Sequence, residues 1–166
     1  MSLSFSIRSA GAMDAASLLE IYRPYIDSST TSFELRIPAV GEFADRIQNA
    51  VEKWSWLLAE VEGQPVGYAY GSTHRVREAY AYSVETSVYV LESYHRRGIA
   101  NALYENLFAQ LQERGYVSAF AGITLPNDPS VKFHKQFGFK PIGIFPRVGF
   151  KFDTWLDVEW LYCPIQ

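Results

Sequence analysis

The chain has 166 residues, of which 48% are hydrophobic and 16% aromatic, and its formal net charge is −3. This balance excludes a disordered chain and suits one packed domain over residues 1–166. Nucleic acid is not the expected partner, because phosphate contacts need clustered Lys and Arg, and the sequence has no basic block.

The first half of the chain predicts two helices beside an antiparallel hairpin. Residues 5–8 alternate apolar and polar side chains, as a short strand does. Apolar side chains at spacing three and four predict helices on either side of a polar loop over 27–38, at 15–26 and 39–53. A hairpin over 54–72 follows, with its turn at Glu62-Gly63.

The second half interleaves strands and helices. The apolar pattern and the turn residues predict four strands, at 83–90, 118–124, 140–145 and 154–163, with residues 146–153 joining the last two. They predict two helices, at 98–114 and 127–137. Regular βαβ alternation is missing, so we expect an α+β or mixed-sheet α/β domain rather than a doubly wound one.

The segment from Ser87 to Phe108 carries the first functional signal. A strand passes through a charged turn into a helix, and the unpaired N–H groups of a helix start attract anions. Gly98 lets a phosphate approach the backbone, and Arg96 and Arg97 offer forked donors. The pattern is neither a Walker loop nor a dinucleotide fingerprint. An ordinary strand–turn–helix with solvated arginines is the alternative.

The turn and helix start, His95-Arg96-Arg97-Gly98-Ile99-Ala100, resemble the Q/R-x-x-G-x-G/A acetyl-CoA signature of the GNAT N-acetyltransferases, with His95 at the Gln/Arg position. Five further blocks run in order from Thr30 to Val158 and resemble the phosphinothricin and methionine sulfoximine acetyltransferase branch. They are "TTSFE", "WSWLLAEVEGQPVGYAYG", "SVETSVYV", "LPNDPSVKFHKQFGF" and "VGFKFDTWLDV".

The resemblance implies a mixed sheet that splays open between its fourth and fifth strands, 83–90 and 118–124, and is flanked by helices. It implies acetyl-CoA as cosubstrate, with the pantetheine arm paired to the fourth strand. The residues expected to bind acetyl-CoA are Val88, Tyr89, Val90, Arg96, Arg97, Gly98, Ile99, Ala100, Asn101, Tyr104 and Asn127. Tyr104 has core packing as its alternative role.

Amide formation from a thioester needs a route for protons and donors for the oxyanion. The resemblance indicates Glu85, near the acceptor amine, and His134, where the wider superfamily has tyrosine. Their alternatives are a solvent-facing carboxylate and a structural histidine. The sequence does not assign proton removal between these two. We expect the Val90 N–H, freed by a bulge, as oxyanion donor.

Arg75 and Arg77 lie between two strands and suit a grip on a substrate carboxylate, although a solvated loop is the alternative. Phe33 is a candidate substrate contact, and Tyr80, Tyr82 and Trp155 are candidate pocket walls. His74 and His95 have no cysteine or carboxylate pattern around them, so no metal site is expected.

The single cysteine, Cys163, cannot form an internal disulfide, and no apolar run resembles a signal peptide or a membrane span. We therefore expect a cytoplasmic protein without membrane contact. The resembling branch implies a homodimer, with residues 149–160 as a candidate interface.

The sequence thus predicts an acetyl-CoA-dependent N-acetyltransferase acting on the α-amine of a small amino acid or analogue, of the phosphinothricin, methionine sulfoximine or methionine sulfone type. One alternative keeps this chemistry on a peptide N-terminus, a polyamine or another amine. Another is a non-catalytic domain that senses acyl-CoA.

Overall fold

A seven-stranded sheet of order β1-β2-β3-β4-β5-β7-β6 organises the computed structural model, which describes residues 3–166. Neighbouring strands are antiparallel except β4 and β5, which are parallel, so the predicted mixed sheet is confirmed. The strands are β1 (Ser6–Ser9), β2 (Trp56–Val61), β3 (Gln64–Thr73), β4 (Ser83–Val90), β5 (Ser118–Thr124), β6 (Lys140–Lys151) and β7 (Thr154–Pro164).

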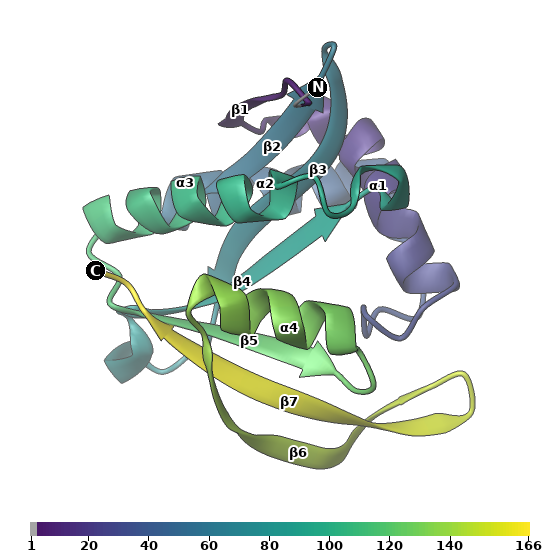
Figure 1. Cartoon of the computed structure of the whole chain (residues 1–166), viewed down its shortest axis with the longest axis vertical. Coiled ribbons are helices and arrows are strands. Elements are labelled where there is room, and N and C mark those ends of the chain that lie inside the picture. Colours follow the sequence, from purple (N-terminus) through teal and green to yellow (C-terminus); the bar gives the residue numbers. More distant parts are fainter. Residues whose placement is uncertain (1–2) are drawn as a thin grey trace.

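Helices cover both faces of this sheet (Figure 1). They are α1 (Ala15–Asp27), α2 (Val40–Lys53), α3 (Ile99–Glu113) and α4 (Asp128–Phe137). The core on one face joins α1 and α2 to β2 and β3, and the core on the other joins α3 to β4, β5 and β7. Among residues 3–166, no helix is long and apolar enough to cross a membrane.

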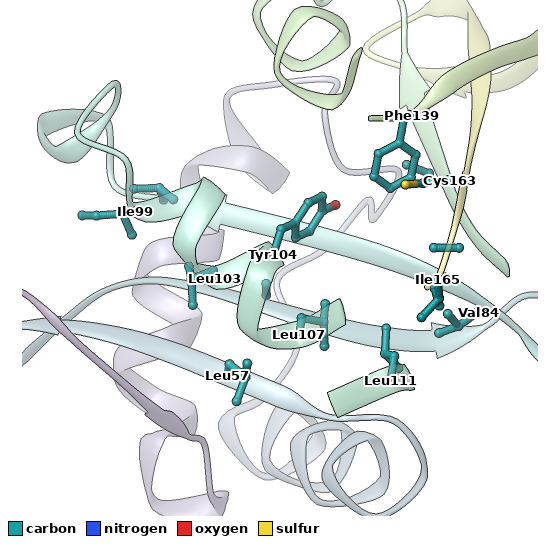
Figure 2. Packing of buried hydrophobic residues seen from close by; sticks show 14 of the residues in the cluster. Leu57, Val84, Ile99, Leu103, Tyr104, Leu107, Leu111, Phe139, Cys163 and Ile165 are labelled. Carbon is teal, nitrogen blue, oxygen red and sulfur yellow. The ribbon is translucent and has the colours of Figure 1, made fainter. Parts of the chain in front are cut away.

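The spacing-four pattern of α3 explains how this helix is held. Ile99, Leu103, Leu107 and Leu111 are at most 1% exposed, and Figure 2 shows them in one cluster with Leu57 of β2 and Val84 of β4. One apolar stripe therefore buries the helix against the sheet. The start of α3 is thereby placed beside the end of β4 (Figure 1).

β4 and β5 separate after a short parallel contact. They pair only from Ser83↔Ser118 to Glu85↔Phe120, whereas both strands continue to Val90 and Thr124. Each is paired at length on its other side, β4 with β3 and β5 with β7. The strands diverge visibly in Figure 1, and the predicted splay between the fourth and fifth strands is confirmed.

The prediction that residues 146–153 form a connection is wrong. β6 continues to Lys151, and only Phe152 and Asp153, both with positive φ (51° and 55°), make the turn to β7. The register shifts between Phe145 and Gly149. This irregularity breaks the period-two pattern from which a strand is recognised in sequence.

Lys151 ties the end of β6 to the loop over residues 28–39. Its buried ammonium donates to the carbonyls of Ser29 (2.8 Å) and Ser32 (2.7 Å). Buried cations need such partners. The loop that precedes α2 is therefore fixed against β6, at one side of the opening in the sheet.

Candidate active site

Two spaces meet where β4 and β5 part. A cleft of about 600 Å³ is lined by residues of the 28–39 loop, β4, β5, β6 and β7, including Phe33, Glu34, Glu85 and Trp160. A smaller space of about 50 Å³ is lined by Tyr104, Asn127 and His134, among others. Both share the strip made by Thr31, Thr86, Ser87, Tyr89, Gly122 and Thr124. The opening in the sheet therefore connects the two spaces.

Glu85 lines the larger cleft near the point where the strands separate. Its Oε1 lies 3.1 Å from His74 Nδ1 and 3.7 Å from the Arg75 guanidinium. Burial raises the pKa of the Glu85 carboxyl, and the hydrogen bond from His74 and the charge of Arg75 partly offset this. The result is a carboxylate that takes up a proton more readily than an exposed glutamate.

His134 lies on the other side, where α4 faces α3. Its Nδ1 is 2.8 Å from the Ser130 carbonyl, and its Nε2 is 3.0 Å from the Tyr104 hydroxyl. A carbonyl only accepts, so Nδ1 carries the proton, and in the neutral ring Nε2 accepts from Tyr104. Burial lowers the pKa of His134 and raises that of Tyr104. The imidazole is therefore neutral, and its ring lines the smaller space.

Glu85 and His134 lie on opposite faces of the sheet. Val84 and Val90 of β4 pack in the α3 core, while Tyr89 packs against the α1–α2 core. Side chains alternate along a strand, so Glu85 points to the same face as Tyr89, away from His134. A group that spans the opening can reach both residues, but they do not contact each other in this arrangement.

The peptide groups of Val88 and Val90 face the opening. Leu91 N–H donates to the Val66 carbonyl, so the opposed pair Gly67↔Val90 is a non-hydrogen-bonded pair. The predicted bulge at Val90 is wrong, because β3 and β4 pair in unbroken register. The Val90 N–H points away from β3 by normal antiparallel alternation.

The segment before α3 has the backbone expected of an anion site. Gly98 has φ 83° and precedes the helix, no side chain among residues 3–166 caps its first N–H groups, and Arg96 has φ 58°. The Arg97 guanidinium lies 5.5 Å over the Tyr94 ring. His95 instead contacts β4, with Nε2 2.9 Å from the Val90 carbonyl, which also accepts from Tyr25 (2.6 Å). His95 thus fastens this segment to β4.

Of the predicted acceptor contacts, Phe33 lines the cleft, whereas Arg75 does not line it but contacts two residues that do, Glu85 at 3.7 Å and the Trp160 ring at 5.9 Å. Arg77 is exposed and does not line it. The aromatic wall candidates Tyr80, Tyr82 and Trp155 do not line it either. Residues 3–166 contain no group of three or more His, Cys, Asp or Glu side chains arranged to hold a metal ion.

Three further residues of the site are not among those predicted from the sequence. The sequence presents His74 only as a possible metal ligand, whereas in the structure it contacts Glu85. Glu34 and Trp160 line the cleft with buried polar atoms, Glu34 Oε2 and Trp160 Nε1, that have no partner within residues 3–166. Unpaired buried polar atoms are uncommon and favour a bound ligand. Glu34 is the last residue of the block "TTSFE", so this block is the sequence feature that points to it.

Comparison with known proteins agrees with this geometry. The acetyltransferase (GNAT) domain family matches residues 7–160. A phosphinothricin N-acetyltransferase of Streptomyces viridochromogenes is 37% identical, over 92% of this chain and 83% of its own. An L-methionine sulfoximine/L-methionine sulfone acetyltransferase of Pseudomonas paraeruginosa is 30% identical, over 96% of this chain and 94% of its own.

Among solved structures, a phosphinothricin acetyltransferase from Sinorhizobium meliloti in complex with acetyl-CoA superposes with a TM-score of 0.91 at 30% identity, covering 97% of this chain and 88% of its own. The family match spans most of the chain, and both the fold and the divided sheet agree with it. The chain therefore belongs to the GNAT family of acetyltransferases.

Proposed function

We propose that this protein transfers the acetyl group of acetyl-CoA directly to the α-amine of a small amino acid or analogue, with both substrates bound at once. The relatives' names favour phosphinothricin, methionine sulfoximine and methionine sulfone as acceptors. The observation that carries the proposal is the continuity between the cleft of Glu85 and the space of His134. It lets an amine on one face meet a thioester on the other.

Acetyl-CoA is assigned to the α3–α4 face and the opening. The free edge of β4 offers the Val88 peptide group to the pantetheine arm, as an added strand would use it, and the Val90 N–H to the thioester carbonyl, since the Val90 carbonyl is already bonded to Tyr25 and His95. The left-handed Gly98 and the first N–H groups of α3 suit the pyrophosphate. The remaining contacts assigned to acetyl-CoA are Tyr89, Arg96, Arg97, Ile99, Ala100, Asn101, Tyr104 and Asn127.

The division of the site between two faces supports a division of the proton transfers. Forming the amide from an ammonium releases one proton to solvent and moves a second to the sulfur of coenzyme A. Glu85, on the acceptor face, takes the first. His134 is neutral, and its Nε2 exchanges the hydrogen bond from Tyr104 for one from the reacting nitrogen, accepts the second proton there and passes it to the departing thiolate. The Val90 N–H is the oxyanion donor.

The acceptor is assigned to the larger cleft. Its ammonium lies toward Glu85, its α-carboxylate toward Arg75 and its side chain toward Phe33. A carboxylate in the cleft needs a cationic partner, because an unpaired charge is costly away from water. Arg75 is better placed for this than Arg77, because it lies next to both Glu85 and Trp160.

We further propose that the protein is a cytoplasmic homodimer. β6 is an edge strand with exposed apolar side chains, among them Ile142 (60% exposed), Ile144 (53%) and Phe150 (50%). An exposed apolar edge strand is prone to pair with another chain. A second copy meeting β6 covers this surface.

Acetyl-CoA is expected to stabilise the fold. At about 100 times its dissociation constant it adds about 2.7 kcal/mol to the free energy of unfolding, or roughly 5–10 °C in Tm for a domain of this size. Gly98→Asp abolishes the shift, because its carboxylate repels the pyrophosphate. Gly63→Asp is the matched control, since Gly63 also has positive φ (76°) with open space around it. Equal shifts in both variants would place the pyrophosphate elsewhere.

Glu85→Gln and His134→Gln are each expected to lower kcat by about 10²-fold or more, the usual scale for acid–base groups. The acetyl-CoA dissociation constant stays unchanged. Because burial raises the pKa of Glu85, wild-type kcat falls as pH drops through this raised value, and the fall is absent in Glu85→Gln. Wild-type turnover in either folded variant removes that residue from the mechanism, and a variant that fails to fold assigns it to structure.

The acceptor class is tested by thiol release from acetyl-CoA with free amino acids, their methyl esters, amides, polyamines and peptides. Free acids are expected to be the better substrates, and esters poor ones, because the ester lacks the charge that Arg75 binds. Arg75→Ala raises KM for the amino acid by roughly tenfold or more, the scale of one charge-assisted hydrogen bond. Arg77→Ala has the smaller effect.

If amides, polyamines or peptides react as well as free acids, the acceptor is another amine, and Arg75 is not its carboxylate partner. If acetyl-CoA binds but no amine is acetylated, the acyl-CoA-sensing alternative takes first place.

The dimer is expected to dissociate when charge is placed on β6. The double variant Ile142→Glu/Ile144→Glu should elute as a monomer in size-exclusion chromatography with light scattering, whereas the wild type elutes as a dimer. Val76→Glu, at a site that is 94% exposed on the β3–β4 connection, controls for added surface charge. A wild type that is monomeric at 100 times the assay concentration contradicts the dimer.

A further inference from the structure

His74, which follows β3 directly, contacts the Glu85 carboxylate but does not line the acceptor cleft. Its ring is held on three sides. It stacks on Phe120, with ring centres 4.4 Å apart and planes 15° apart, and meets Tyr80 and Trp160 edge-on at 5.7 and 6.2 Å. The side chain is only 12% exposed. The ring therefore has one well-defined orientation.

That orientation directs Nδ1 at Glu85 Oε1, 3.1 Å away. An ionised carboxylate only accepts hydrogen bonds, so Nδ1 carries the proton whether the imidazole is neutral or charged. Arg75 approaches the same oxygen, Oε1, at 3.7 Å. The hydrogen-bond donor His74 and the cationic Arg75 therefore both lie at Oε1. The oxygen that remains for a ligand in the cleft is Oε2.

We propose that His74 is a positioning residue for Glu85, whose Oε1 it holds through Nδ1–H so that Oε2 is presented to the acceptor amine. The inference rests on the proposed function, because the amine belongs to that reaction. His74 acts through Glu85 and touches neither substrate. Phenylalanine would preserve the stack on Phe120 without the donor, so the donor is the property under test.

Among the groups around Glu85, His74 makes the contact that most stabilises the ionised carboxylate. Burial works against the charged carboxylate, and the hydrogen bond from His74 is the largest influence that favours it. The titratable or charged groups that face this carboxyl from the neighbouring elements are His74 and Arg75 on the β3–β4 connection, Tyr70 on β3, and Glu34 in the lining of the same cleft. β5 and β7 contribute Phe120 and Trp160, which do not titrate in this range.

The test compares His74→Phe with His74→Asn. Phenylalanine keeps a ring on Phe120 and removes the donor, whereas asparagine places an amide N–H near the position of Nδ1. His74→Phe is expected to lower kcat about tenfold, the scale of one hydrogen bond to a charged group. Loss of the donor raises the pKa of Glu85, so the acid limb of the kcat profile moves to higher pH. The acetyl-CoA-induced Tm shift is unchanged.

His74→Asn restores kcat and the acid limb toward the wild type, and Val76→Ala, on the same connection and 94% exposed, changes neither. The titration of the Glu85 carboxyl is followed independently by NMR on protein carrying ¹³C-labelled glutamate, with the signal assigned from Glu85→Gln. It is expected to shift to higher pH in His74→Phe and to return in His74→Asn.

Three results overturn the proposal: wild-type kinetics in His74→Phe, equal impairment of both His74 variants with an unmoved acid limb, or an unchanged Glu85 titration. The second result would mean that His74 acts only by packing on Phe120. If the wild type acetylates no free amino acid, the proposed function fails, and the NMR titration alone then decides whether His74 governs Glu85.

Discussion

β4 and β5 pair over only the stretch from Ser83↔Ser118 to Glu85↔Phe120, and the rest of the molecule depends on this short contact. β5 pairs with β7 along its whole length, and β7 in turn carries β6. β4 pairs with β3 from Val84 to Val90. The two halves of the sheet therefore diverge from the short β4–β5 pairing. Their separation leaves backbone N–H and C=O groups of β4 facing a gap. Such groups need hydrogen-bond partners when they are buried.

Helix packing joins the two halves of the sheet beside the gap. α3 is anchored by its stripe of buried leucines to the half-sheet of β4, and Tyr104 extends from it into an aromatic cluster with Phe133, Phe137 and Phe139 around α4. The hydroxyl of Tyr104 then meets His134. The same side chain thus packs against α4 on one face and contacts the His134 imidazole at the opening, so core packing does not exclude the role proposed for it at the site.

The sequence was sufficient for what local pattern determines. The hairpin turn at Glu62-Gly63, the start of α3 and the extent of α4 follow from residue type and spacing. The full length of β6 was not predictable, because a register shift interrupts its alternation. His74 was missed for another reason. Its partner Glu85 lies eleven residues away, and only the pairing of β3 with β4 reveals that they are neighbours.

The charge pattern of the cleft favours the proposed zwitterionic acceptor over a simple amine. Glu34 is paired with Arg46 through Oε1, and its Oε2 remains without a partner among residues 3–166. Glu85 lines the same cleft, with His74 and Arg75 at its Oε1. An ammonium finds carboxylate oxygens in this cleft, but a purely cationic acceptor also meets Arg75 beside Glu85. A ligand that brings its own carboxylate converts that repulsion into an ion pair, because each of its charges then faces the opposite sign.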